Sequence, residues 1–222
     1  MALKLPNEIT KELAEEVGWH IGDGSMNFYS NHGIKKGIYQ LRGHIEDDRL
    51  HYLNRIKPLF KLLYGLDISL REMPSTRVFG FQIWNNELVK FKEGLGLPLG
   101  KKLDVQIPNA LLNNDQLKAA VVRGIFDTDG TVYLQKRYGK LYPRLEISTI
   151  SLKLAEQLCT ALNQLGLRAT FNTLNKVRGN RLVSYKVNVR GVEMLHNFMK
   201  IISPKNPKHL LKYSRFRQSL NN

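Results

Sequence analysis

The 222-residue chain has a single cysteine, few acidic residues for its many basic ones, and no long hydrophobic run. One cysteine, Cys159, excludes an intrachain disulfide framework and a cysteine-rich zinc site. No apolar stretch approaches the roughly 18 residues of a membrane span, and no signal-peptide hydrophobic region follows the first methionine. A hydrophobic content of 42% argues against a disordered chain. We therefore expect a soluble globular protein made in a reducing compartment.

The basic excess is large and unevenly placed. The chain has 34 Lys and Arg against 19 Asp and Glu, a net charge of +15. Residues 1–111 carry 15 basic and 13 acidic side chains, whereas residues 112–222 carry 19 and 6. Such an excess favours a polyanionic partner, and nucleic acid is the commonest. On composition alone, a charge that serves only solubility stays open.

The chain repeats itself. Residues 13–25 match residues 119–131, which places Gly18 on Gly124 and Asp23 on Asp129 at an offset of 106. Both segments are followed by alternating stretches, a helical pattern, two more alternating stretches and a short helix. This order predicts an α+β fold, a tandem repeat of αββαββα units related by a pseudo-twofold axis. We expect the first unit at residues 1–104, a linker at 105–114 and the second unit at 115–222.

The first helix of each unit has small residues on one face. Ala14 and Gly18 lie four apart, as do Ala120 and Gly124 in the second copy. A mid-helix glycine costs about 1 kcal/mol relative to alanine, so helix propensity does not explain the pattern. Close packing of the two helices against each other does explain it.

If these helices pack in parallel, their C-termini meet, and Asp23 and Asp129 stand at those ends. Two carboxylates at the negative ends of two helix dipoles are unfavourable unless a cation binds them. Mg²⁺ suits such oxygen ligands, and the preceding carbonyls of Gly22 and Thr128 can add to them. A paired-carboxylate metal site in a basic protein indicates phosphodiester hydrolysis.

Both segments resemble the LAGLIDADG motif of homing endonucleases, and the repeat covers nearly the whole chain, as in single-chain members with two motifs. The resemblance implies a monomeric double-strand DNA endonuclease that uses Mg²⁺, with Mn²⁺ as a substitute. The family's catalytic acid matches Asp23 and Asp129. Asp127 also matches a motif acid, but Ile21 stands there in the first copy, so we expect Asp127 to have a structural role at the helix end.

The resemblance also implies that each unit lays a four-stranded antiparallel sheet into the major groove. Alternate residues of a strand face opposite sides, which predicts the DNA-facing set. Half-exposed strands are polar on their water side in any case, but this set has few acids. It comprises Tyr29, Asn31, Lys35, Gln40, Arg42, His44, Ser69, Arg71 and Gln82 in the first unit, and Gln135, Arg137, Arg144, Glu146, Ser148, Arg168, Thr170, Asn172, Lys186, Asn188 and Arg190 in the second.

Family members often place a Lys or Gln near the metal to assist catalysis. The candidates here are Arg190, at the end of a strand, and Lys186, the nearest strand lysine. Trp84 stands at the position of Arg190 in the first unit.

Two other functions remain open: an RNA maturase that binds its host intron RNA, and a DNA-binding regulator on a degenerate core. Both motif acids are intact, which favours the nuclease. No intein-like splicing block flanks the repeats, so we expect a free-standing, intron-encoded enzyme with no membrane partner. It would act in the cytoplasm or nucleoid of an archaeon or bacterium, or in an organelle matrix.

Overall fold

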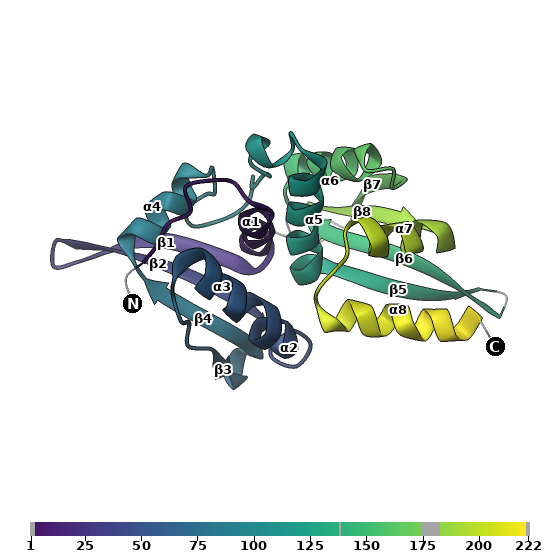
Figure 1. The fold of residues 1–222 in the computed structure, drawn as a ribbon, viewed down its shortest axis with the longest axis horizontal. Helices are drawn as coiled ribbons and strands as arrows, with labels where there is room; N and C mark the ends of the chain where they lie inside the picture. Colours follow the sequence, from purple (N-terminus) through teal and green to yellow (C-terminus); the bar gives the residue numbers. More distant parts are fainter. Residues whose placement is uncertain (1–2, 138, 175–182, 221–222) are drawn as a thin grey trace.

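A computed structural model describes residues 3–137, 139–174 and 183–220, and Figure 1 shows the two units side by side. In the first unit the elements are α1 (Lys11–Asp23), β1 (Gly24–Asn31), β2 (Ile34–His44), α2 (Arg49–His51), η1 (Tyr52–Ile56), α3 (Lys57–Tyr64), β3 (Arg71–Met73), η2 (Pro74–Thr76), β4 (Val78–Trp84) and α4 (Asn86–Gly94). The turn η3 (Asn109–Leu111) precedes the second unit. The second unit has α5 (Asp115–Asp129), β5 (Gly130–Arg137), β6 (Lys140–Thr149), α6 (Leu152–Gln164), β7 (Ala169–Leu174), β8 (Ser184–Arg190), α7 (Val192–Ile201) and α8 (Pro207–Leu220).

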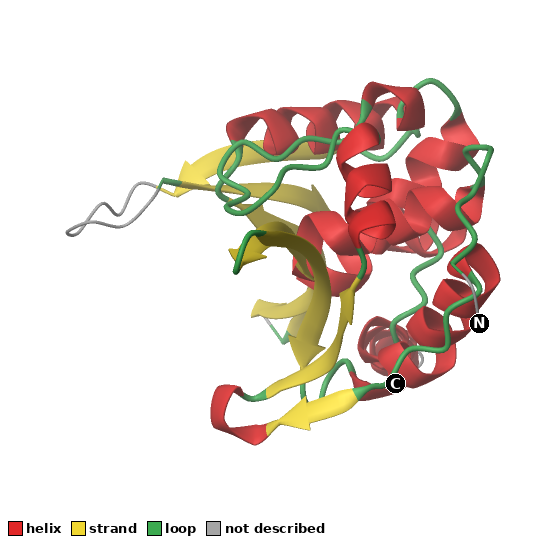
Figure 2. Cartoon of the chain, turned by 90° about the vertical axis from the view of Figure 1, so that its left-hand side faces the viewer, coloured by secondary structure: helices red, strands yellow, loops and turns green. Residues whose placement is uncertain are grey.

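Each unit contains one four-stranded antiparallel sheet, and the two sheets have the same strand order. The orders are β1-β2-β4-β3 and β5-β6-β8-β7. Figure 2 shows the strands gathered along one side of the molecule and most of the helices on the other. The predicted α+β tandem repeat is therefore confirmed. The second unit adds α8, which packs against β5 and β6 and buries Phe216.

The motif helices begin and end where local chemistry dictates. Thr10 caps α1, its hydroxyl accepting from the amide of Leu13, and Asn114 caps α5 in the same way. Each helix ends at its aspartate, because the next residue, Gly24 or Gly130, adopts an extended conformation and starts a strand. The aspartates thus stand where a motif helix turns directly into an edge strand of its sheet, β1 or β5.

The two motif helices touch backbone to backbone. A Cβ added to Gly18 would lie 2.3 Å from the carbonyl oxygen of Val121, and one added to Gly124 would lie 2.1 Å from that of Glu15. Gly22 in turn meets Thr128, so residue numbers rise together along both helices and the helices run parallel. The expected glycine contact and the meeting of the two C-termini are both confirmed.

A buried carboxylate reinforces this contact. Glu15 of α1 accepts hydrogen bonds from Arg55 of the same unit at 2.7 and 2.8 Å and from Arg123 of α5 at 2.9 Å. These guanidinium groups hold the pKa of Glu15 below its ordinary value, despite its burial. The units are thus joined by a polar clamp as well as by glycines. Within the described residues, no helix is both long enough and apolar enough to span a membrane.

Candidate active site

The helix ends bring Asp23 and Asp129 together. A Cβ placed on Gly22 would lie 3.3 Å from the carboxyl carbon of Asp129, so the carboxylate of α5 lies against the end of α1. One placed on Gly43 of the neighbouring strand β2 would lie 3.0 Å from Asp23 Oδ2. Both positions therefore depend on glycine, which leaves room for the carboxylates beside the sheet.

The surroundings of Asp23 disfavour the charged form of its carboxyl group. Burial, followed by the charges of Asp129 and Asp48, raises its pKa to about 8, while Lys208 and Lys102 only partly oppose the rise. Its Oδ2 atom is buried and has no hydrogen-bond partner among the described residues. The side chain of Asp129 is more exposed, but desolvation by the surrounding protein also raises its pKa. A bound cation would therefore stabilise the charged form of both carboxylates.

Two lysines that sequence reasoning missed stand at the same helix ends. Lys102 Nζ donates to the carbonyls of His20 at 3.1 Å and Ile21 at 2.8 Å, and also to that of Gly22. Lys208 Nζ donates to the carbonyl of Thr128 at 3.3 Å. Each ammonium group therefore compensates the negative end of one motif helix.

A signal for this pair existed in the sequence, because Lys102 and Lys208 are separated by the same 106 residues as the two aspartates. The lysines also bear on the expected metal ligands. The carbonyls of Gly22 and Thr128, which were predicted to face a cation, each accept one hydrogen bond from a lysine in the structure. Each carbonyl oxygen keeps a second lone pair, so the possible donor set for a metal is the two carboxylates together with these carbonyls.

A third carboxylate, Asp48, makes the site asymmetric. It is buried, and its Oδ1 accepts from Asn206 Nδ2 at 2.7 Å and from Lys208 Nζ at 2.8 Å. Its Oδ2 accepts from the amide of His44 at 2.8 Å. Lys208 is therefore held in an ion pair, whereas Lys102 has no ion pair among the described residues. Nothing in the repeat pattern marks Asp48.

The residues present fit a divalent cation of the Mg²⁺ type. The described residues contain no cluster of three His, Cys, Asp or Glu that could enclose a metal. Mg²⁺ is usually held by one or two carboxylates and completed by water and substrate phosphates, so two aspartates with an unpartnered buried oxygen match that requirement.

The outward faces of both sheets carry most of the side chains predicted to bind DNA. Directly paired residues of antiparallel strands share a face, so the register assigns each side chain to one side. On this face lie Tyr29, Gln40, Arg42, His44, Arg71 and Gln82 in the first sheet, and Gln135, Arg144, Glu146, Ser148, Thr170, Asn172, Lys186, Asn188 and Arg190 in the second. Ser69 and Arg168 are exposed just before β3 and β7. The side chains of Asn31 and Arg137 lie outside the described part of the chain.

Several of these residues have other roles than predicted. Lys35 shares the opposite, helix-covered face with Tyr39, and its Nζ lies 4.3 Å from the centre of the Phe28 ring. Asn188 is buried, and its amide donates to Asn172 Oδ1 and to the carbonyl of Lys186, both at 2.9 Å. It therefore orders the sheet.

The two predicted auxiliary cations lie at different places on the second sheet. Arg190 pairs with Arg144 at the outer end of β8, away from the helix ends. Lys186 pairs with Ser148, in the row that flanks Asp129, and its Nζ binds Glu146 Oε2 at 2.9 Å. Lys102 and Lys208 stand at the helix ends themselves.

Asp127 has the structural role expected of it. Its carboxylate accepts from the backbone amides of Lys205 and Asn206 at 2.9 to 3.1 Å. Asn206 also donates to the carbonyl of Asp127 at 2.8 Å. The motif residue thus fastens the segment that carries Lys208 to the end of α5.

Comparisons with known proteins agree with this geometry. A family model described as a LAGLIDADG-like domain matches residues 116–203. The homing endonuclease I-DmoI in complex with DNA and Ca has a TM-score of 0.61 at 18% identity, covering 86% of each chain. Its complex with DNA and Mn gives 0.62 and covers 86% of this chain and 96% of that one.

Two relatives from Methanocaldococcus jannaschii match in sequence. The replication factor C small subunit is 30% identical over 197 residues, which is 87% of this chain and 9% of the relative. The glutamine–fructose-6-phosphate aminotransferase (isomerizing) is 24% identical over 203 residues, 90% of this chain and 17% of the relative. This chain thus spans only a small part of the length of either protein.

Proposed function

We propose that this chain, which carries a LAGLIDADG-like domain and has the two-unit fold of LAGLIDADG homing endonucleases, is a site-specific endonuclease that cuts both strands of DNA. The observation that carries the proposal is the pair Asp23 and Asp129 at the ends of two packed helices. Both carboxyl groups have raised pKa values, one has an oxygen without a partner, and a lysine stands beside each helix end.

Asp23 and Asp129 would hold the divalent cation, with Mg²⁺ as the natural ion and Mn²⁺ as a substitute. When bound by these residues, the ion would supply the chemistry of metal-assisted phosphodiester hydrolysis, which is polarisation of a phosphate and a lower pKa of bound water. Asp23 must give up its proton first, because its pKa of about 8 keeps it largely neutral at pH 7 in the free protein. We assign Lys102 and Lys208 the auxiliary role: their ammonium groups stabilise the charge that develops on the phosphate.

The outward faces of the sheets would bind DNA on either side of this centre. The two faces differ in sequence, so the target is a long asymmetric duplex rather than a palindrome. One chain supplies both aspartates, which supports a monomer. Arg144 and Arg190 add positive charge to the second face, in line with the concentration of basic residues in the second half.

We also propose that the enzyme is intron-encoded and acts where the DNA of an archaeon, bacterium or organelle lies. The two M. jannaschii relatives have unrelated names, and each contains the matching segment as a small part of one longer polypeptide, which supports a mobile coding segment but not an intron in particular. Sequencing the DNA on both sides of the coding region tests this: an intron boundary on each side is expected, and an uninterrupted host reading frame contradicts it.

Cleavage of a randomised duplex library by the purified protein tests the activity. With Mg²⁺ we expect cuts in both strands at one long asymmetric site, with none in EDTA and binding without cutting in Ca²⁺. Asp23→Asn should abolish cutting and retain binding. Specific binding with no cleavage under any divalent cation would contradict the nuclease and leave intron RNA as the next ligand to test.

A further inference from the structure

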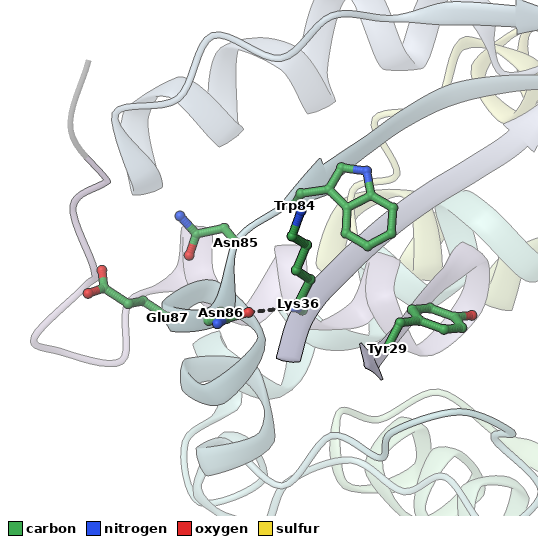
Figure 3. Close-up of a pocket in the computed structure, with 7 residues that line it drawn as sticks. Tyr29, Lys36, Trp84, Asn85, Asn86 and Glu87 are labelled. Carbon is green, nitrogen blue, oxygen red and sulfur yellow. Dashed lines mark hydrogen bonds between the residues drawn. The ribbon is translucent and has the colours of Figure 1, made fainter. Parts of the chain in front are cut away.

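An apolar hollow lies on the outward face of the first sheet, away from the aspartates. Tyr29 on β1 and Trp84 on β4 are each 54% exposed, which is unusual for such large rings. Their ring centres are 6.3 Å apart. With Lys36 and the start of α4, the two rings line a hollow of about 670 Å³, and Figure 3 shows these side chains.

The register shows that this hollow belongs to the face that would meet DNA. Trp84 pairs with Ile38, and Tyr29 pairs with Lys36, on the same side of the sheet as Gln40 and its partners. The row next to it, nearer to the aspartates, consists of Ser25, Gln40 and Gln82. A polar row is thus followed outward by an apolar one.

The two asparagines beside the hollow are already engaged. Asn85 Oδ1 accepts from the amide of Leu88 and caps α4. Asn86 Oδ1 accepts from the amide of Gly37, and its Nδ2 donates to the carbonyl of Lys35 at 3.1 Å. The two rings, the Lys36 ammonium and the Glu87 carboxylate remain to meet a ligand, and neither of these charged groups has an ion pair among the described residues.

The second unit supplies an internal comparison. At an offset of 106, Ile38 and Trp84 correspond to Arg144 and Arg190, and the same register pairs these two arginines. One position in the fold is therefore apolar on one sheet and doubly cationic on the other. General attraction to phosphate explains the arginines, but not an exposed Trp beside an exposed Tyr.

We propose that this hollow, which we call the aromatic recess (Tyr29, Lys36, Trp84 and the start of α4), selects thymine by receiving its 5-methyl group in the major groove. The proposal rests on the function proposed above and adds a base preference to it. Thymine alone among the four bases presents a methyl group in that groove, and apolar side chains recognise it by contact. Lys36 beside the rings would meet a neighbouring phosphate.

The register also locates the thymine. Asn27, in the row of Trp84, follows Asp23 by four residues, and Tyr29 follows it by six. At about 3.3 Å per strand residue and 3.4 Å per base pair, the recess lies roughly four to six base pairs from the centre of the cut, on the side of the first unit.

The experiment compares duplexes that differ by one methyl group. Once library selection has given the target, each thymine in the first half-site is replaced singly by deoxyuridine, and affinity is measured in Ca²⁺. We expect a loss of about fourfold, the value of one buried methyl group, at one thymine within four to six base pairs of the centre. The Trp84→Ala protein should bind the thymine and uracil duplexes equally, whereas Arg190→Ala, the matched control, should bind more weakly and keep their ratio.

Two results would overturn the proposed thymine selection. One is a selected target with no thymine in that window, and the other is a thymine-to-uracil affinity ratio that stays unchanged in the Trp84→Ala protein. The assay measures binding and needs no cleavage. If the protein cuts DNA but shows no thymine preference of this kind, the role of the recess is refuted and the proposed endonuclease function stands. Fluorescence gives an independent readout, because the only other tryptophan, Trp19, is fully buried. Emission should change on binding the thymine duplex and stay constant in Trp84→Phe.

Discussion

Replacing Asp23 by asparagine should make the metal-free protein more stable while it abolishes cleavage. The carboxyl group has a pKa of about 8 in the folded chain, against 3.8 as its ordinary value. At pH 7 the unfolded chain has released this proton and the folded chain has kept it, so ionisation favours unfolding. The difference of 3.2 pH units between 3.8 and 7 corresponds to about 4 kcal/mol. Asparagine carries no such cost.

The sign of the pH dependence follows from the same pKa. A carboxyl group whose pKa is raised on folding binds more protons in the folded chain, so its contribution to stability falls as pH rises from about 4 to about 8 and is constant above. The buried histidines His20, His51 and His209, whose pKa values are lowered, act in the opposite direction below their ordinary value. Both proteins contain them, so the difference between wild type and variant isolates Asp23.

The assay is chemical denaturation of both proteins in EDTA at pH 4, 6, 7 and 8.5. The variant should gain stability over the wild type with rising pH, reach about 4 kcal/mol at pH 7, and match it near pH 4. Added Mg²⁺ should stabilise the wild type more than the variant. A variant that is less stable than the wild type at pH 7 in EDTA would refute the idea that the Asp23 carboxylate is destabilising unless a cation binds it.

Three further predictions concern the helix ends, the helix contact and the DNA. Lys102→Met should slow cleavage by about 10²–10³-fold in single-turnover assays with each strand labelled, whereas the exposed neighbour Lys101→Met should cleave normally; equal rates would remove the auxiliary role. Gly18→Ala forces a Cβ to 2.3 Å from a backbone carbonyl and should cost about 3 kcal/mol or more in denaturation, while Gly94→Ala on α4, with nothing within 4 Å, should be neutral or stabilising. DNA affinity should fall about 10³-fold or more between 50 and 200 mM salt, and a flat dependence would argue against an extended phosphate interface.

The asymmetry at the helix ends makes the strand-resolved assay informative. Lys208 is bound to Asp48 at 2.8 Å, whereas Lys102 is free of carboxylate partners in the described part of the chain. The two lysines therefore need not contribute equally to cutting the two strands.

The sequence alone determined the repeat, the parallel helix contact and the meeting of the two aspartates. These follow from local rules: small residues four apart lie on one helix face, a glycine starts the extended strand after each aspartate, and side chains alternate along a strand. The same rules assigned most outward side chains to their faces. They placed Lys35 on the wrong side, because the register of its hairpin, and not its residue type, decides the face.

Only the tertiary structure decided what surrounds the carboxylates. Lys102 and Lys208 reach the helix ends from segments about 80 residues beyond their aspartates, and Asp48 enters from another direction. Such contacts depend on how whole units pack, and neither periodicity nor spacing encodes them directly. For the same reason, Arg190 was predicted at the catalytic centre, although the pairing of β8 with β6 carries it to the outer end of the sheet.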